Sequence, residues 1–220
     1  MGADALLTRP IALVVALALV SLLPFVFMSL TAFVKISTVL QIAKSALGAQ
    51  SVPSNTVMMA LAAALSLLAM APVGEKIVDR ARPLLDQKLE TGAMVERGID
   101  AVREPLRDFL RANSSDKEKI RFLEVARNAR PEATRAQITD ADLTVLAPAF
   151  VVTELTEAFA IGFLIFLPFL VLDLVVANVL LALGMQMLNP TQVSLPFKLL
   201  LFVAIDGWGL LAQALVSGYR

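Results

Sequence analysis

The amino-acid sequence predicts an all-α membrane protein with four apolar helical segments arranged in hairpins and a helical extramembrane domain between the second and the third. Of the 220 residues, 58% are hydrophobic and 17% are charged, and the mean hydropathy is +0.76; soluble domains average about 45–50% apolar and about 25% charged residues. The charged residues are also clustered, because 28 of the 38 lie in 75–142. The chain is therefore expected to divide into an N-terminal apolar hairpin (1–74), a charged helical domain (75–142) and a C-terminal apolar hairpin with a methionine loop (143–220).

The first apolar segment, Pro10–Val34, contains 25 residues without a charge, which exceeds the about 20 residues that a transmembrane helix needs. A cleaved signal peptide is the alternative, but its apolar stretch usually has about 7–15 residues, so we expect a retained helix. The remaining segments are Thr56–Val73, Ala149–Leu172 with a continuation to Gly184, and Leu195–Val216.

Residues 75–142 are expected to form helices, since Ser115 and Glu118 have the spacing of a capping box ahead of an apolar stripe. The segment before the second apolar run, Lys35–Asn55, is expected to be a linker. It holds two lysines, Lys35 and Lys44, and no acid. Short loops rich in Lys and Arg tend to be cytoplasmic, so this segment is predicted to face the cytoplasm and the charged domain the periplasm.

The sequence has no cysteine and no histidine. Disulfides, zinc sites built on these residues and catalytic Cys-His or Ser-His pairs are therefore excluded. The net charge is zero, which gives no reason to expect a nucleic-acid partner. We expect no cofactor, no metal and no enzymatic activity, and we expect contact with membrane lipid.

Five ionisable residues interrupt the C-terminal apolar segments: Glu154, Glu157, Asp173, Lys198 and Asp206. Charges inside such segments are costly and usually face partners or water. Four acids and one base cannot all pair among themselves. The unpaired acids must therefore face a wet pore, meet another subunit, be protonated or be hydrated at the membrane boundary, and the sequence leaves these alternatives open. Lys198 is expected to have an acidic partner, either Asp173 or a carboxylate of a neighbouring subunit. Asp206 is not that partner, because eight residues of helix separate them by about 12 Å.

Three stretches of the chain carry motifs. The first comprises Leu23-Pro24-Phe25, Lys35-Ile36-Ser37-Thr38-Val39-Leu40, Ala46-Leu47-Gly48-Ala49-Gln50 and Pro53-Ser54-Asn55. The second comprises Pro148-Ala149-Phe150, Glu154-Leu155, Ala158-Phe159, Ile161-Gly162-Phe163 and the run 166–177. The third comprises Gly184-Met185-Gln186-Met187-Leu188, Ser194-Leu195-Pro196-Phe197-Lys198 and Asp206-Gly207-Trp208. In this order, with a charged domain between the first and the second, they resemble the signatures of the SctR/FliP family.

This resemblance implies a subunit of the type III secretion export gate in the bacterial inner membrane. The family's members assemble in five copies with two smaller subunit types, SctS/FliQ-like and SctT/FliR-like, and unfolded proteins pass through the centre. The family's methionine loop, which narrows the pore as a gasket, matches Met185, Gln186 and Met187, with Gln186 where the family often has a third methionine. An injectisome is favoured over a flagellum by the short N-terminus.

Two methionines that are two residues apart cannot both face one lumen from a regular helix, so the gasket interpretation requires an irregular backbone around Met185 and Met187. The alternative is that these methionines only fill a helix end. Two other functions also remain open. A small-solute channel or secondary transporter would account for the buried charges, although transporters tend to show internal repeats that this chain lacks. An intramembrane hydrolase would need Asp173 and Asp206 as a catalytic pair.

Overall fold

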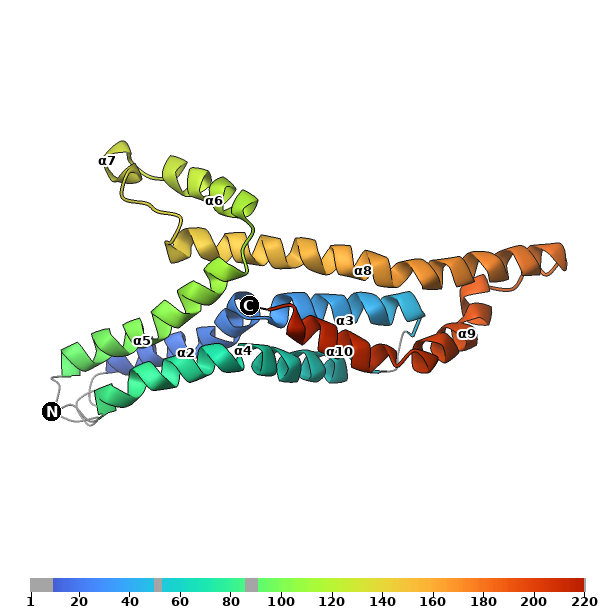
Figure 1. Cartoon of the computed structure of the whole chain (residues 1–220), viewed down its shortest axis with the longest axis horizontal. Coiled ribbons are helices and arrows are strands. Elements are labelled where there is room, and N and C mark those ends of the chain that lie inside the picture. The colour runs from blue at the N-terminus through green and yellow to red at the C-terminus, as the bar shows by residue number, and fades with distance from the viewer. Residues whose placement is uncertain (1–9, 50–52, 86–90, 220) are drawn as a thin grey trace.

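The computed structural model describes residues 10–49, 53–85 and 91–219. Among these residues there are helices and no strands, as the composition predicts. Figure 1 shows an elongated bundle in which α8 runs along most of the molecule. The helices are α2 (Pro10–Leu30), α3 (Phe33–Leu47), α4 (Asn55–Leu85), α5 (Thr91–Ala112), α6 (Asp116–Asn128), α7 (Glu132–Arg135), α8 (Leu143–Ala182), α9 (Pro190–Ala204) and α10 (Gly207–Ser217).

The first apolar segment differs from its prediction. The helix expected over Pro10–Val34 ends at Leu30, and α3 follows after a bend of 66°. At the bend the Thr31 hydroxyl donates to Phe27 O at 2.6 Å, accepts from Phe33 N at 3.3 Å and lies 3.2 Å from the Ser66 hydroxyl. These contacts satisfy backbone groups that a continuous helix would otherwise pair, so the chain turns here.

The expected linker Lys35–Asn55 is wrong for most of its length, because α3 occupies it to Leu47. Ile36, Val39, Leu40 and Ala43 repeat at helical spacing and are almost fully buried. The linker was expected because lysines usually lie in solvated segments. Here protein partners hold the ammonium groups of Lys35 and Lys44, and the segment is a helix inside the bundle. Gly48 ends the helix in the left-handed conformation, with φ of 73°, as glycines commonly do at this position.

Helix α4 continues through the expected boundary at residue 74 and ends at Leu85. The apolar hairpin and the charged part of the chain therefore share one helix. The charged part itself is helical, and Ser115 caps α6 by accepting a hydrogen bond from Glu118 N at 3.3 Å. In a capping box the Glu118 carboxylate would accept a hydrogen bond from the backbone N–H of Ser115. Here that N–H donates instead to Thr153 Oγ1 on α8 at 3.1 Å. This contact ties the charged domain to α8.

The third apolar segment and its continuation form one helix. Helix α8 has 40 residues, a length of about 60 Å, twice the about 30 Å of a bilayer's hydrocarbon core. The last segment is broken: α9 and α10 meet at a bend of 58°. Asp206 lies at this bend with φ of 53°, and Gly207 leaves room for the Phe202 ring, since a Cβ there would lie 2.3 Å from Phe202 Cε2.

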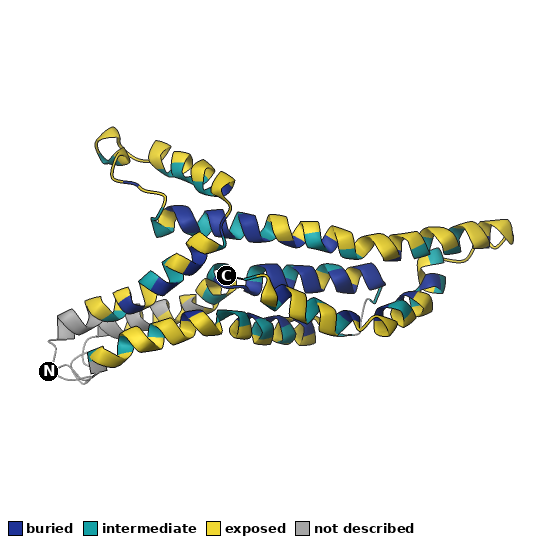
Figure 2. Cartoon of the chain, viewed as in Figure 1, coloured by how far each residue is buried: buried dark blue, intermediate teal, exposed yellow. Residues whose placement is uncertain are grey.

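The buried residues of the bundle gather around α3 and the first half of α8 (Figure 2). The two helices approach closely at Gly162, where an added Cβ would lie 2.5 Å from Ile42 Cδ1. Along α8 the buried positions recur every three or four residues; they include Leu146, Phe150, Glu154, Ala158, Gly162 and Phe169. Toward Ala182 most side chains of α8 are exposed (Figure 2).

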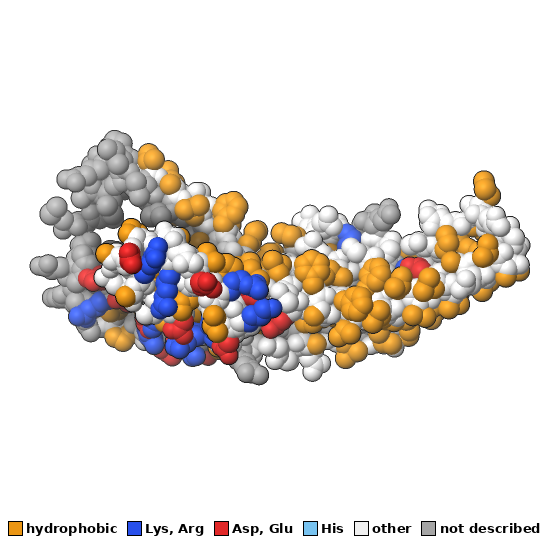
Figure 3. Space-filling view, turned by 90° about the horizontal axis from the view of Figure 1, so that it is seen from above, with side chains coloured by type: hydrophobic (Ala, Val, Ile, Leu, Met, Phe, Trp, Pro, Cys, Tyr) orange, Lys and Arg blue, Asp and Glu red, His pale blue; other side chains and the backbone are white. Residues whose placement is uncertain are grey.

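Within the described residues, α4 and α8 are long and apolar enough to cross a membrane, and the two bent pairs, α2 with α3 and α9 with α10, raise the number of candidate spans to four. Figure 3 shows the charged side chains gathered toward one end of the visible face and apolar side chains covering much of the rest. The protein is an all-α membrane protein.

Candidate functional site

The central feature of the bundle is a buried cluster of charges between α3 and α8. Lys35 Nζ lies 2.9 Å from Glu154 Oε1 and 2.6 Å from Glu157 Oε2. The Glu154 side chain has no exposed surface, whereas that of Glu157 is 52% exposed. The two glutamates are three residues apart and so share a face of α8. Glu154 therefore has a protein partner and no contact with water, and Glu157 pairs with the same ammonium from the edge of the bundle.

Tyr219, just beyond α10, completes this cluster. Its phenol donates to the Glu154 carboxylate, and Ala32 O is a second acceptor within reach at 3.2 Å. Lys35 Nζ lies 4.5 Å from the centre of the Tyr219 ring, a distance suited to a cation–π contact. The cluster thus joins the start of α3, the N-terminal half of α8 and the C-terminal residues of the chain.

A second buried pair joins α8 to α9. Lys198 Nζ lies 2.7 Å from Asp173 Oδ2 and donates to Ala46 O of α3 at 3.2 Å. Ser194 donates to the other oxygen of Asp173. The acidic partner expected for Lys198 is therefore Asp173 of the same chain, and α3, α8 and α9 meet at this one ammonium.

Asp206 has a different setting from Asp173. Its backbone is left-handed, and its carboxylate folds over Gly209, where a Cβ would lie 2.4 Å from Asp206 Oδ2. It does not pair with Lys198, in agreement with the spacing. An intramembrane hydrolase would need Asp173 and Asp206 as a catalytic pair. In the structure Asp173 forms an ion pair with Lys198, and Asp206 lies at the start of α10.

The methionine loop lies at the end of α8, far from the α5–α7 region (Figure 1). The backbone from Leu183 to Asn189 is not helical, and Gly184 has φ of 72°. The side chain of Met187 is 99% exposed and that of Met185 is 47% exposed. Met185 and Gln186 line a small cavity of about 320 Å³ together with residues of α8. Met187 therefore packs against nothing in the chain itself.

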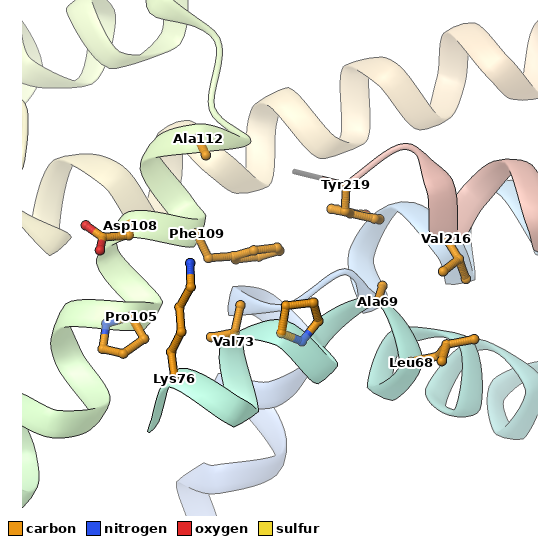
Figure 4. Close-up of a pocket in the computed structure, with 11 residues that line it drawn as sticks. Leu68, Ala69, Val73, Lys76, Pro105, Asp108, Phe109, Ala112, Val216 and Tyr219 are labelled. Atoms are coloured by element: carbon orange, nitrogen blue, oxygen red, sulfur yellow. The ribbon is translucent and has the colours of Figure 1, made fainter. Parts of the chain in front are cut away.

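An apolar cavity of about 390 Å³ lies between α4, α5 and the C-terminal residues (Figure 4). Phe109 and Tyr219 form one of its walls, with ring centres 5.9 Å apart, and Lys76 and Asp108 are the charged side chains that line it. Tyr219 thus links the charged cluster on one side to the α5 helix on the other.

Sequence reasoning missed Lys35, Lys44 and Tyr219. The burial of the two lysines could have been inferred from the apolar residues around them. Ile36, Val39 and Leu40 recur at helical spacing and form one face of a buried helix that also carries both lysines. Nothing in the sequence marks Tyr219, because its partners lie 65 and 187 residues away.

Comparison with known proteins identifies the family of the chain. The model of the FliP family matches residues 16–215, and the chain belongs to this family. It is 46% identical over 209 residues to the hypersensitivity response secretion protein HrcR of Ralstonia nicotianae, covering 94% of this chain and 96% of the relative. It is 43% identical over 209 residues to Yop proteins translocation protein R of Yersinia pestis, with 94% and 95% covered. It is 39% identical over 222 residues to the flagellar biosynthetic protein FliP of Caulobacter vibrioides, with 100% and 80% covered.

Lys198→Met tests the second ion pair, since it keeps most of the side-chain volume and removes the charge. Removing one partner of a buried pair costs up to about 3–5 kcal/mol, and the partial exposure of Asp173 places this variant below that limit. We expect a lower free energy of unfolding in detergent, partly restored in Lys198→Met/Asp173→Asn. Arg82→Met is the control, because its 3.9 Å contact with Asp79 is exposed on both sides and should contribute little. Equal losses in the two single variants would contradict a structural role for the pair.

Proposed function

We propose that this chain is a core subunit of a type III protein secretion export gate, where it forms with its partners the pore through which unfolded proteins cross the inner membrane. Family membership over residues 16–215 supports the export apparatus, since the relatives are named for secretion, translocation and flagellar biosynthesis. The observation that carries the pore is Met187, which stands fully exposed beyond the end of a helix about 60 Å long.

The surface of α8 supports an oligomer. Its C-terminal half exposes a run of large apolar side chains, and the apolar surface of α9 continues beside it. Contiguous apolar surface of this kind marks contact with lipid or with other protein chains. The exposed large apolar residues of this half of α8 are Phe163, Leu164, Phe166, Leu167, Leu170, Val171, Leu174, Val175, Val179 and Leu181. Five copies around one axis, with SctS/FliQ-like and SctT/FliR-like subunits, would cover this surface and bring the methionine loops together.

The methionine loop suits a gasket on chemical grounds. Methionine side chains are flexible and polarizable, so they can close around irregular surfaces. The irregular backbone between α8 and α9 frees Met185 and Met187 from helical geometry. Gln186 adds an amide to the constriction. A small-solute channel is less well supported, because the buried charges of Glu154, Asp173 and Lys198 are engaged in pairs within the chain.

The proposed location is the bacterial inner membrane, with the chain crossing it several times as part of an injectisome and acting without enzymatic activity of its own. In the proposed orientation the α3–α4 turn faces the cytoplasm and the charged domain the periplasm. The start of α6 and the end of α3 lie at separate places along the bundle (Figure 1), as this orientation requires.

Single cysteines test the orientation, and the chain has no native cysteine to interfere. Ser115→Cys and Ser45→Cys place a thiol at exposed positions near α6 and near the end of α3. In intact cells with a permeable outer membrane, we expect a membrane-impermeant maleimide to label Ser115→Cys and to reach Ser45→Cys only after the inner membrane is opened. The reverse pattern would show that the orientation is inverted.

Met185→Ala/Met187→Ala tests the gasket. We expect the gate to assemble with its partners but to leak ions and small solutes across the inner membrane at rest, because the thioethers that close the constriction are gone. Met59→Ala, at an exposed position of α4 outside the loop, is the control and should not leak. Gln186→Met should tighten the seal.

An assembled gate that stays as tight in the double variant as in the parent would show that these methionines are packing residues. Co-purification of the partner subunits distinguishes a tight gate from one that has failed to assemble.

A further inference from the structure

Lys44, in the last turn of α3, is a buried cation without a counter-charge. It is 8% exposed, and its ammonium donates to Asn55 Oδ1 at 2.8 Å. No carboxylate oxygen of the described residues lies within 4.0 Å of it. The two other buried lysines of the described residues, Lys35 and Lys198, both pair with carboxylates. Residues 50–52 follow α3 closely in the chain and carry no charge.

An open cavity of about 440 Å³ lies at this ammonium, and no acidic residue lines it. Four further side chains in its wall carry hydrogen-bond donors: Gln41, Ser45, Asn55 and Thr191. The cavity therefore combines one positive charge with several neutral donors, which is the donor set of an anion site. The complete lining is Gln41, Lys44, Ser45, Gly48, Ala49, Asn55 and Thr191.

Three helix ends meet around the cavity. Helix α3 ends at Gly48, whose added Cβ would lie 3.5 Å from Thr191 Cγ2, and α4 and α9 begin at Asn55 and Pro190. The positive ends of the α4 and α9 dipoles add to the charge of Lys44, and the negative end of the α3 dipole offsets one of them. Asn189 caps α9 by accepting a hydrogen bond from Thr191 N at 3.0 Å, so this backbone N–H is already paired. The helix dipoles therefore contribute an electrostatic field, and the side chains provide the hydrogen bonds to an anion.

We propose that this cavity binds the phosphate group of a membrane phospholipid. Two candidate membrane segments begin at this level, α4 and the bent pair α9 with α10, and the ends of membrane spans lie at the headgroup region. Exposed apolar side chains follow immediately along α4, Val57 and Met59, and offer a surface for acyl chains. Basic pockets between transmembrane helices bind anionic headgroups in this way.

A phosphate group fits the cavity better than a carboxylate from another protein chain. Phosphate presents oxygens in several directions, which matches donors spread over α3 and α9 around a space of about 440 Å³. A carboxylate presents only two oxygens, in one plane, as Asp173 does to Lys198 and Ser194.

Lipid titration of the full-length chain tests the proposal. The purified, delipidated protein in non-ionic detergent is titrated with phosphatidylglycerol, with diacylglycerol and with inorganic phosphate, and bound lipid is counted by native mass spectrometry. We expect phosphatidylglycerol to bind to the parent and to Lys44→Arg, and to bind at least tenfold more weakly to Lys44→Met. Lys76→Met removes an exposed lysine of α4 that lines a different cavity and should bind as the parent does.

Labelling of the parent protein provides a second readout should Lys44→Met fail to fold. Phosphatidylglycerol should protect the Lys44 amine from an acylating reagent and leave Lys76 reactive. Equal binding by Lys44→Met and the parent would overturn the proposal, as would equal protection by inorganic phosphate alone, which would make the site one for a free anion. A Lys44→Cys variant that crosslinks to a neighbouring protein chain in the assembled complex would show a protein group in the cavity and would also overturn it.

Discussion

The fold depends on one buried interaction, the contact of Lys35 with two carboxylates of α8. Glu154 is fully buried, and its oxygens meet the ammonium of Lys35 and the phenol of Tyr219. Burying these charges is costly, and a buried pair often adds little net stability compared with apolar residues of the same size. Its effect here is on geometry, because a slip of α3 along α8 would leave a carboxylate unpaired in an apolar interior.

This constraint matters because α8 is apolar on nearly every side. A helix without a polar face has no hydrophobic pattern that selects which side meets its neighbour. Two acidic residues of α8 determine which side of the helix meets each neighbour. Glu154 pairs with Lys35 of α3, and Asp173 pairs with Lys198 of α9. Between them, Gly162 lets α3 approach closely. The rest of α8 then keeps its apolar surface exposed and carries the methionine loop at its end.

The sequence predicted the class of fold because composition and uncharged length depend on no tertiary contact. It also predicted the start of α6 at Ser115, and Asp173 was one of the two alternatives that it left open as the partner of Lys198. It failed where a charge is held by residues outside its own helix: Lys35 and Lys44 were placed in a linker, yet they lie on a buried helix, paired with Glu154 and Asn55. The bend at Thr31 was missed for the same reason, since the Ser66 hydroxyl that meets Thr31 comes from α4. The roles of Met185, Gln186 and Met187 remain predictions, because they depend on chains beyond this one.

The most direct test of this account is a double-mutant cycle on Lys35 and Glu154, with the free energy of unfolding in detergent as the readout. Lys35→Met and Glu154→Gln should each destabilise the protein, and the double variant should recover part of the loss, with a coupling energy of about 1–3 kcal/mol. The same cycle on Arg82 and Asp79, an exposed pair, should show almost none. Additive effects at Lys35 and Glu154, within about 0.5 kcal/mol, would mean that this pair does not hold α3 against α8.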